Sequence, residues 1–173
     1  MKTFYLVFLA LSLMLCQTGV AQKRSKAEKA AQIEKGLQEV QKLVDSQEFQ
    51  IDIDRVYPQN GMDMSRFNPT GKITIMDSIA KGELPFFGRA YTAPLAGDNG
   101  IEFDDLIKES SSKVVKKRKI TAVEYKFSVP RKNDLYEFTI SIASNSKCTV
   151  TLNSNNKSHI SYSGTISPIE KEE

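Results

Sequence analysis

The last third of the chain alternates apolar and polar residues in four consecutive runs, and no other feature constrains the fold as strongly. A repeat of two is that of a β-strand with one buried face, because successive side chains in a strand point to opposite sides. Short polar segments separate the runs, which indicates an antiparallel meander with tight turns. The positions expected to face inward are Val123, Tyr125, Phe127, Val129, Tyr136, Phe138, Ile140, Ile142, Cys148, Val150, Leu152, Ile160, Tyr162, Gly164 and Ile166.

The opposite face of this meander is rich in hydroxyl groups. Threonine is both polar and a good strand former, so a hydroxyl-rich face is most simply a face exposed to solvent. The residues expected on it are Thr139, Ser141, Thr149, Thr151, Ser161 and Ser163.

The residues from Ser25 to Val44 predict one amphipathic helix. Ser25 and Glu28 fit a capping box, in which each side chain accepts a hydrogen bond from a free amide at the helix start. Gly36 weakens the helix and allows a neighbouring segment to approach closely. We expect the helix to lie on the side of a sheet, because its apolar stripe is narrow. The stripe consists of Ala30, Ile33, Leu37, Val40 and Val44.

Between the helix and the meander, shorter patterns predict further strands. Residues 49–53 and 72–76 read as strands, and Lys81-Gly82 reads as a break between strands. Residues 84–91 read as a strand interrupted by Pro85 and Gly88, and residues 101–103 begin another.

Together these patterns predict an α+β fold in a single globular domain over residues 22–173. It consists of one N-terminal helix at about residues 25–45 and a mostly antiparallel, curved or barrel-like sheet of about seven or eight strands at about residues 49–167. Pattern alone does not separate a closed barrel from an open curved sheet.

The first 21 residues predict a cleavable signal peptide. Lys2 precedes an apolar run from Phe4 to Cys16, which is too short to cross a membrane as a helix. Gly19 and Ala21 provide the small side chains that signal peptidase requires, so we expect cleavage between Ala21 and Gln22. The alternative is a lipoprotein acylated on Cys16, but Leu15 occupies a position that normally needs a small residue. The expected location is therefore the periplasm or the extracellular space, with no transmembrane segment after cleavage.

Cysteine and charge usage exclude several kinds of function. After cleavage Cys148 is the only cysteine, so no intramolecular disulfide forms, and its place in the alternation predicts a buried thiol. The 24 basic and 21 acidic residues nearly balance, which gives no reason to expect a nucleic-acid partner. The basic run from Lys113 to Lys119 is expected to form a charged loop or sheet edge that discourages aggregation.

Residues 84–94, with the sequence LPFFGRAYTAP, and residues 100–103 resemble a family of exported Bacteroidetes proteins known as domain of unknown function 4251. The segment from Ile160 to Gly164 and the helix leading to Phe49 are also similar to that family. The resemblance implies a secreted, periplasmic or surface-associated protein of unknown activity. It supplies no catalytic residues.

Three residues of this string, Phe87, Arg89 and Tyr91, are the candidates for a binding site. An arginine among aromatic rings has the chemistry to bind a carboxylate, a phosphate or a sugar. For Arg89 itself we favour a structural interpretation, in which it stacks on a ring and pairs with one of the acids that follow, thereby fixing a bulged strand. Those acids are Glu102, Asp104 and Asp105.

No pattern predicts a catalytic residue, a cofactor or a metal site. His159 is the only histidine, so a zinc site of the usual kind cannot form, and we expect this residue on the surface. The favoured function is a non-enzymatic binding or accessory protein of the cell envelope, with an envelope component or a small anionic ligand as partner. The alternative is a hydrolase of envelope glycan or peptide, with Asp104 or Asp105 as acid or base.

Overall fold

A computed structural model describes residues 26–67, 69–91, 100–117, 120–131 and 133–169. The chain divides into two compact units, Met1–Ala31 and Gln32–Glu173, and only the start of one helix is described in the first unit. The predicted signal peptide, Cys16 and the cleavage site between Ala21 and Gln22 lie outside the described residues. No described helix has the length and apolar character needed to cross a membrane.

In the described part of the chain, one α-helix precedes nine strands. The helix α2 spans Lys26–Asp45, and a short 3₁₀ helix, η2, spans Ser65–Phe67. The strands are β1 (Glu48–Pro58), β2 (Gly71–Met76), β3 (Ile79–Pro85), β4 (Gly100–Leu106), β5 (Glu109–Lys117), β6 (Ile120–Arg131), β7 (Asp134–Ile142), β8 (Lys147–Asn153) and β9 (Ile160–Pro168).

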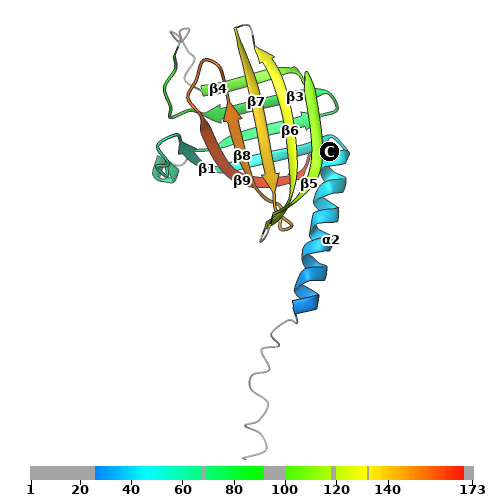
Figure 1. The fold of residues 1–173 in the computed structure, drawn as a ribbon. Coiled ribbons are helices and arrows are strands. Elements are labelled where there is room, and N and C mark those ends of the chain that lie inside the picture. Colours follow the sequence, from blue (N-terminus) through cyan, green and yellow to red (C-terminus); the bar gives the residue numbers. More distant parts are fainter. Residues whose placement is uncertain (1–25, 68, 92–99, 118–119, 132, 170–173) are drawn as a thin grey trace, which may run out of the picture. The chain divides into compact units, whose positions relative to one another are not determined.

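All nine strands belong to one antiparallel sheet in the order β4-β3-β2-β1-β9-β8-β7-β6-β5. The sheet thus consists of two meanders, β1 to β4 and β5 to β9, joined where β1 pairs with β9. It curls into a half-barrel, so that β6, β7 and β8 cross over β2, β3 and β4 (Figure 1). The α+β prediction is confirmed, with nine strands instead of seven or eight, and the curled sheet stays open because β4 and β5 are unpaired edges.

The sheet differs from the sequence prediction in the segment that forms β2 and β3. The turn between β2 and β3 lies at Asp77 and Ser78, so the break predicted at Lys81-Gly82 is wrong. Gly82 is instead in the middle of β3, directly opposite Phe103 on β4, where an added Cβ would overlap the phenyl ring. The glycine is there to make room for an aromatic side chain, not to form a turn.

The predicted strand over residues 84–91 ends at Pro85. Beyond this point the backbone leaves β3, because its hydrogen bonds are made to other parts of the chain. The Tyr162 hydroxyl donates to the Pro85 carbonyl oxygen at 3.0 Å, and Ala90 forms an isolated bridge with Lys157.

The interior of the half-barrel contains the apolar side of the alternating pattern. Tyr125, Phe138 and Val150 are all buried, and the rings of Phe127 and Phe138 stack with centroids 4.6 Å apart. Phe103 packs across the interior of the half-barrel, since the centroid of its ring lies 5.0 Å from that of Phe138 on the opposite side. The hydroxyl-rich face is exposed or half-buried, as expected.

Only the C-terminal part of the apolar stripe of helix α2 is buried. Leu37, Val40 and Val44 are buried, whereas Ile33 is exposed. Gly36 faces the backbone of Ser144 so closely that a Cβ would overlap the carbonyl oxygen, which confirms the close approach expected of this glycine.

Candidate functional site

The segment with Phe87, Arg89 and Tyr91 is fixed against the connection between β8 and β9. The Ser158 amide donates to the Arg89 carbonyl oxygen at 2.9 Å, and the Arg89 amide donates to the Ser158 Oγ at 3.0 Å. The Tyr91 amide donates to the carbonyl oxygen of Asn156 at 2.8 Å. The backbone of this segment is therefore held in place while the side chains of all three candidate residues remain exposed.

Phe87 is brought together with two residues that the sequence analysis did not identify. Its ring stacks on that of Phe67, with centroids 6.1 Å apart and an interplanar angle of 29°. The guanidinium of Arg66 lies 4.8 Å from the centroid of Phe67. Arg66 and Phe67 come from η2, in the connection between β1 and β2, and no periodic pattern in the sequence marks them.

We refer to Arg66, Phe67, Phe87, Arg89 and Tyr91 as the aromatic loop surface. Its rings are unusually exposed: 55% for Phe67, 38% for Phe87 and 64% for Tyr91. Most large aromatic side chains of a domain are buried, and exposed aromatic groups that gather on one surface commonly mark an interaction site. Two loops, each carrying an arginine, supply these side chains.

Lys157, not Arg89, makes the contacts with an aromatic ring and a neighbouring strand that fix the segment after β3. It is buried, its Nζ donates to the Gly100 carbonyl oxygen at 2.8 Å, and it lies 5.2 Å from the centroid of the Phe86 ring. The lysine thus ties the residue after β3 to the residue that begins β4. Among the described residues no ion pair joins Arg89 to the acids on β4, so the expected arginine–acid contact is wrong.

A carboxylate supports the connection from the other side. Asp134 accepts hydrogen bonds from the amides of Leu135 and Asn155 at 2.8 and 2.9 Å and from the Ser154 hydroxyl at 2.6 Å. Ser154 Oγ in turn accepts from the Lys157 amide at 2.9 Å. The segment that holds the aromatic loop surface is therefore anchored to the start of β7.

Asp104 and Asp105, the acids considered for hydrolysis, do not converge. They are consecutive on β4 and therefore point to opposite faces of the sheet. Asp104 lies 3.3 Å from Lys81 on β3, and Asp105 lies 3.0 Å from Arg131 on β6. Each carboxylate is paired with a cation, and the two are not placed to act on one bond together.

The remaining candidates have ordinary structural environments. His159 is exposed, with its Nδ1 2.8 Å from Asn153 Oδ1. Cys148 is buried, and this burial raises the pKa of its thiol to about 12. In the described part of the chain, no group of three or more His, Cys, Asp and Glu side chains is placed to hold a metal ion.

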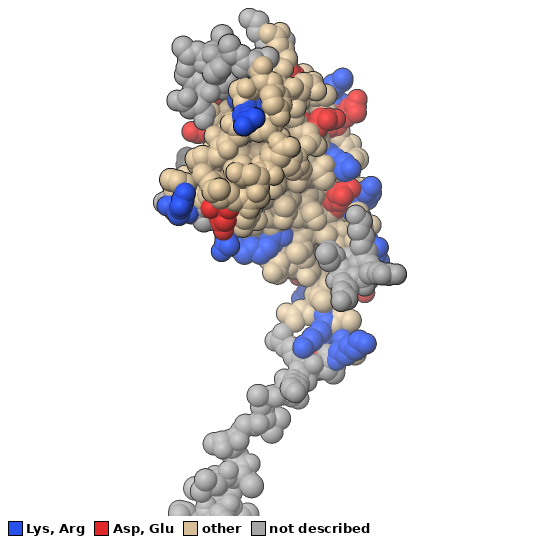
Figure 2. Space-filling view, turned by 60° about the vertical axis from the view of Figure 1, so that its left-hand side comes forward, with Lys and Arg blue, Asp and Glu red and all other residues tan. Residues whose placement is uncertain are grey.

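Charged side chains on the sheet surface pair across neighbouring strands. Lys113 lies 3.3 Å from Glu124, and Lys72 lies 3.6 Å from Asp52. On the face presented in Figure 2, basic and acidic side chains are interspersed around a broad area of uncharged residues.

Comparison with known proteins gives a family and a fold. The family model described as Domain of unknown function (DUF4251) matches residues 31–166. A crystal structure of a DUF4251 family protein from Bacteroides eggerthii is 17% identical in sequence, with a TM-score of 0.54, and the match covers 80% of this chain and 91% of that one. Among curated proteins none matches the chain. The resemblance noted from the sequence is thereby confirmed.

Proposed function

Because the chain belongs to the DUF4251 family, a family of unknown function, its activity has to be argued from its own residues, and we propose that it is a non-enzymatic binding protein of the bacterial cell envelope. The aromatic loop surface is its binding site. The ligand is an envelope component that carries an anionic group.

The observation that carries this proposal is the stack of Arg66, Phe67 and Phe87 between two loops. Stacking on a ring orients a guanidinium and leaves the N–H groups at its edge free to bind a carboxylate or phosphate in bidentate fashion. The exposed ring of Tyr91 adds apolar area for the uncharged part of a ligand. Arg89, on the same fixed segment, supplies a second guanidinium.

The surrounding contacts favour a preformed site. Backbone hydrogen bonds at Arg89 and Tyr91 fix the segment, so little conformational entropy is lost when a ligand binds. The hydrolase alternative receives less support. Paired carboxylates for acid–base catalysis need a shared position at the scissile bond, whereas Asp104 and Asp105 face opposite sides of β4.

The envelope location rests on the predicted signal peptide with cleavage between Ala21 and Gln22. Export to the periplasm or the extracellular space brings the protein to glycans and lipids with carboxylate and phosphate groups. A ligand of this chemistry fits the two arginines of the aromatic loop surface.

Co-sedimentation of the purified protein with isolated cell envelopes tests the proposal. Phe87→Ala and Arg89→Gln should each weaken binding roughly tenfold, because each removes a main contact of the ligand. Leu106→Ala is the control for lost apolar surface, since it removes a more exposed apolar side chain from β4 (65%, against 38% for Phe87). Equal binding of all four proteins would contradict the proposed site, and an absence of binding by the unaltered protein would contradict the function.

A further inference from the structure

A second surface of the molecule has the features of a built binding site. On the side of the sheet that faces away from the core, a groove of about 530 Å³ runs across β1, β9, β8 and β7. Its floor carries the short side chains of Ser141, Thr149 and Ser163, and longer side chains, Arg55 and Tyr57, stand at one end. The hollow exists because the lining side chains on β9, β7 and the middle of β8 are short, whereas long side chains stand on β1.

A β-bulge brings Arg55 to this groove. The pairing of β1 with β9 shifts between Ile53 and Arg55, so that Asp54 and Arg55 are both exposed although they are consecutive in a strand. Gly164 on β9 allows the close approach of the two strands here, because a Cβ at this position would overlap the Asp52 carbonyl oxygen. Bulges of this kind redirect side chains and are frequent beside binding sites.

The strand register aligns the arginine with a row of hydroxyl groups. Arg55 is opposite Ser163 on β9, Ser163 is opposite Thr149 on β8, and Thr149 is opposite Ser141 on β7. Adjacent members of the row are separated by the distance between strands, which is on the order of 5 Å. The row therefore presents one cation followed by three hydroxyl groups in a line, and Lys147 is a second cation in the lining of the groove.

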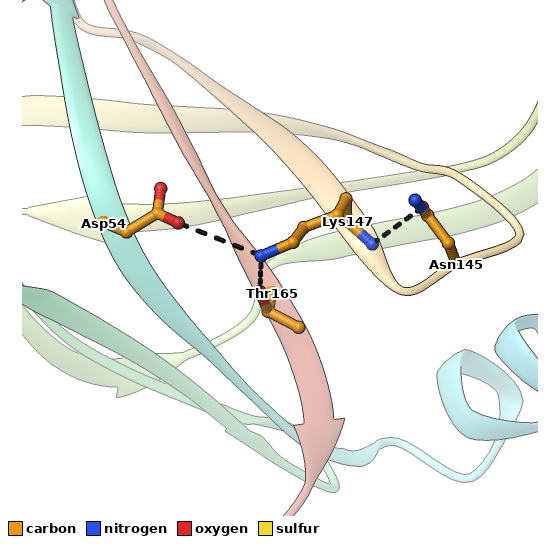
Figure 3. A network of polar contacts seen from close by, with 4 residues as sticks. All are labelled: Asp54, Asn145, Lys147 and Thr165. Atoms are coloured by element: carbon orange, nitrogen blue, oxygen red, sulfur yellow. Dashed lines mark hydrogen bonds and ion pairs between the residues drawn. The ribbon is translucent and has the colours of Figure 1, made fainter.

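Neighbouring contacts hold the charged rim in place. Lys147 Nζ donates to Thr165 Oγ1 at 2.8 Å and lies 3.9 Å from Asp54 Oδ2, and the Lys147 amide donates to Asn145 Oδ1 at 3.3 Å (Figure 3). The side chain of Tyr57 forms a hydrogen bond with Arg55 and thereby raises the pKa of this guanidinium. The lining of the groove carries two cations, Arg55 and Lys147, and one carboxylate, Asp54, so the net charge of the lining is positive. Asp54 and Asp63 are the two carboxylates whose charges act on Arg55.

We propose that this groove binds an acidic saccharide, with the carboxylate of a uronic acid on Arg55 and the sugar hydroxyl groups on Ser163, Thr149 and Ser141. A carboxylate matches the guanidinium, and serine and threonine hydroxyls both donate and accept hydrogen bonds, as sugar hydroxyls do. The ring of Tyr57 offers an apolar surface for the sugar ring. The site goes beyond the proposed function, because it shares no residue with the aromatic loop surface.

Titration of the isotope-labelled protein with tetragalacturonic acid, followed by amide NMR, tests the inference. Saturable shifts should appear at Arg55, Ser163, Thr149 and Ser141, and maltotetraose, a neutral saccharide of the same length, should cause none. Arg55→Gln should weaken binding of the acidic saccharide roughly tenfold, since a charge-assisted contact is lost. Thr149→Val, which keeps the shape of the side chain and removes its hydroxyl, should weaken binding severalfold.

Arg131→Gln is the matched control, because it removes the same charge at an exposed position of β6 outside both proposed sites and should not change this titration. Equal weakening by Arg55→Gln and Arg131→Gln would mean general attraction between charges and would overturn the inference. Competition by inorganic phosphate at the same concentration as the saccharide would show an anion contact without sugar recognition, with the same consequence. Failure here leaves the envelope-binding assay unaffected, so the two proposals stand or fall separately.

Discussion

The ammonium group of Lys157 donates to the Gly100 carbonyl oxygen at 2.8 Å and lies over the ring of Phe86. We expect Lys157→Met to lower the free energy of unfolding by about 1–3 kcal/mol, because the carbonyl loses its donor in a buried position. The melting temperature should fall by several degrees. Lys72→Met, at an exposed lysine, and Arg89→Ala should leave it nearly unchanged. A comparable fall for Arg89→Ala would mean that the arginine has a structural role after all.

The buried thiol of Cys148 makes the stability of the fold depend on pH. Burial raises the pKa of Cys148 from about 9 to about 12. From about pH 9 upward the unfolded chain loses the thiol proton and the folded chain retains it until about pH 12, so unfolding becomes more favourable as pH rises. The free energy of unfolding should fall by up to about 1.4 kcal/mol per pH unit in this window.

Chemical denaturation of the protein and of Cys148→Ala between pH 8 and 10 checks this effect. The alanine variant is less stable at pH 8, because it leaves a small cavity, but its stability should depend less on pH. Parallel pH dependences for the two proteins would show that the thiol does not titrate differently in the folded and unfolded chains.

At the scale of elements, residues that alternate between apolar and polar predict their strands well, because burial of one face imposes the repeat. The meander from residue 123 to 166 follows the pattern throughout. The pattern fails at Gly82 and over residues 86–91, where glycine and proline serve contacts with residues distant in sequence. The candidate site is predicted in part for the same reason: Phe87, Arg89 and Tyr91 lie in a recognisable string, but the stack of Phe87 on Phe67 joins two loops that only the folded sheet brings together.

Asp134, the first residue of β7, anchors the connection between β8 and β9, beside the Asn156 side chain, which donates to the Asn133 carbonyl oxygen at 2.6 Å. Asp134→Ala removes the acceptor of three hydrogen bonds and should release this connection, and with it the segment that holds the aromatic loop surface. Hydrogen exchange should accelerate at the amides of Tyr91 and Ser158, which bond across the bridge. Asp134→Asn, which keeps one acceptor oxygen, should have a smaller effect. Unchanged protection of both amides in the alanine variant would contradict this coupling.

At the scale of the whole molecule, β4 and β5 are the two edges of the open half-barrel, and neither pairs with a further strand among the described residues. The end of α2 contacts one of them, since Gln41 and Asp45 both hydrogen bond to Ser112 at 3.3 Å. Farther along β5 the strand has exposed Lys113, Val114 and Lys116. Lysines on an edge strand disfavour pairing with the sheet of a second molecule. This is the protective role that the sequence predicts for the basic run.

We therefore expect Lys116→Val to make the protein associate. The substitution extends the apolar pair Val114 and Val115 to three residues of high β-propensity on an unpaired edge, which is a template for strand pairing between copies. Size-exclusion chromatography with light scattering should show oligomers that increase with protein concentration, whereas the fold of each copy is retained. Lys35→Val makes the same chemical change at an exposed position of α2, where no edge is available, and should remain unassociated. If both variants associate equally, added apolar surface alone is the cause and the edge of β5 has no special role.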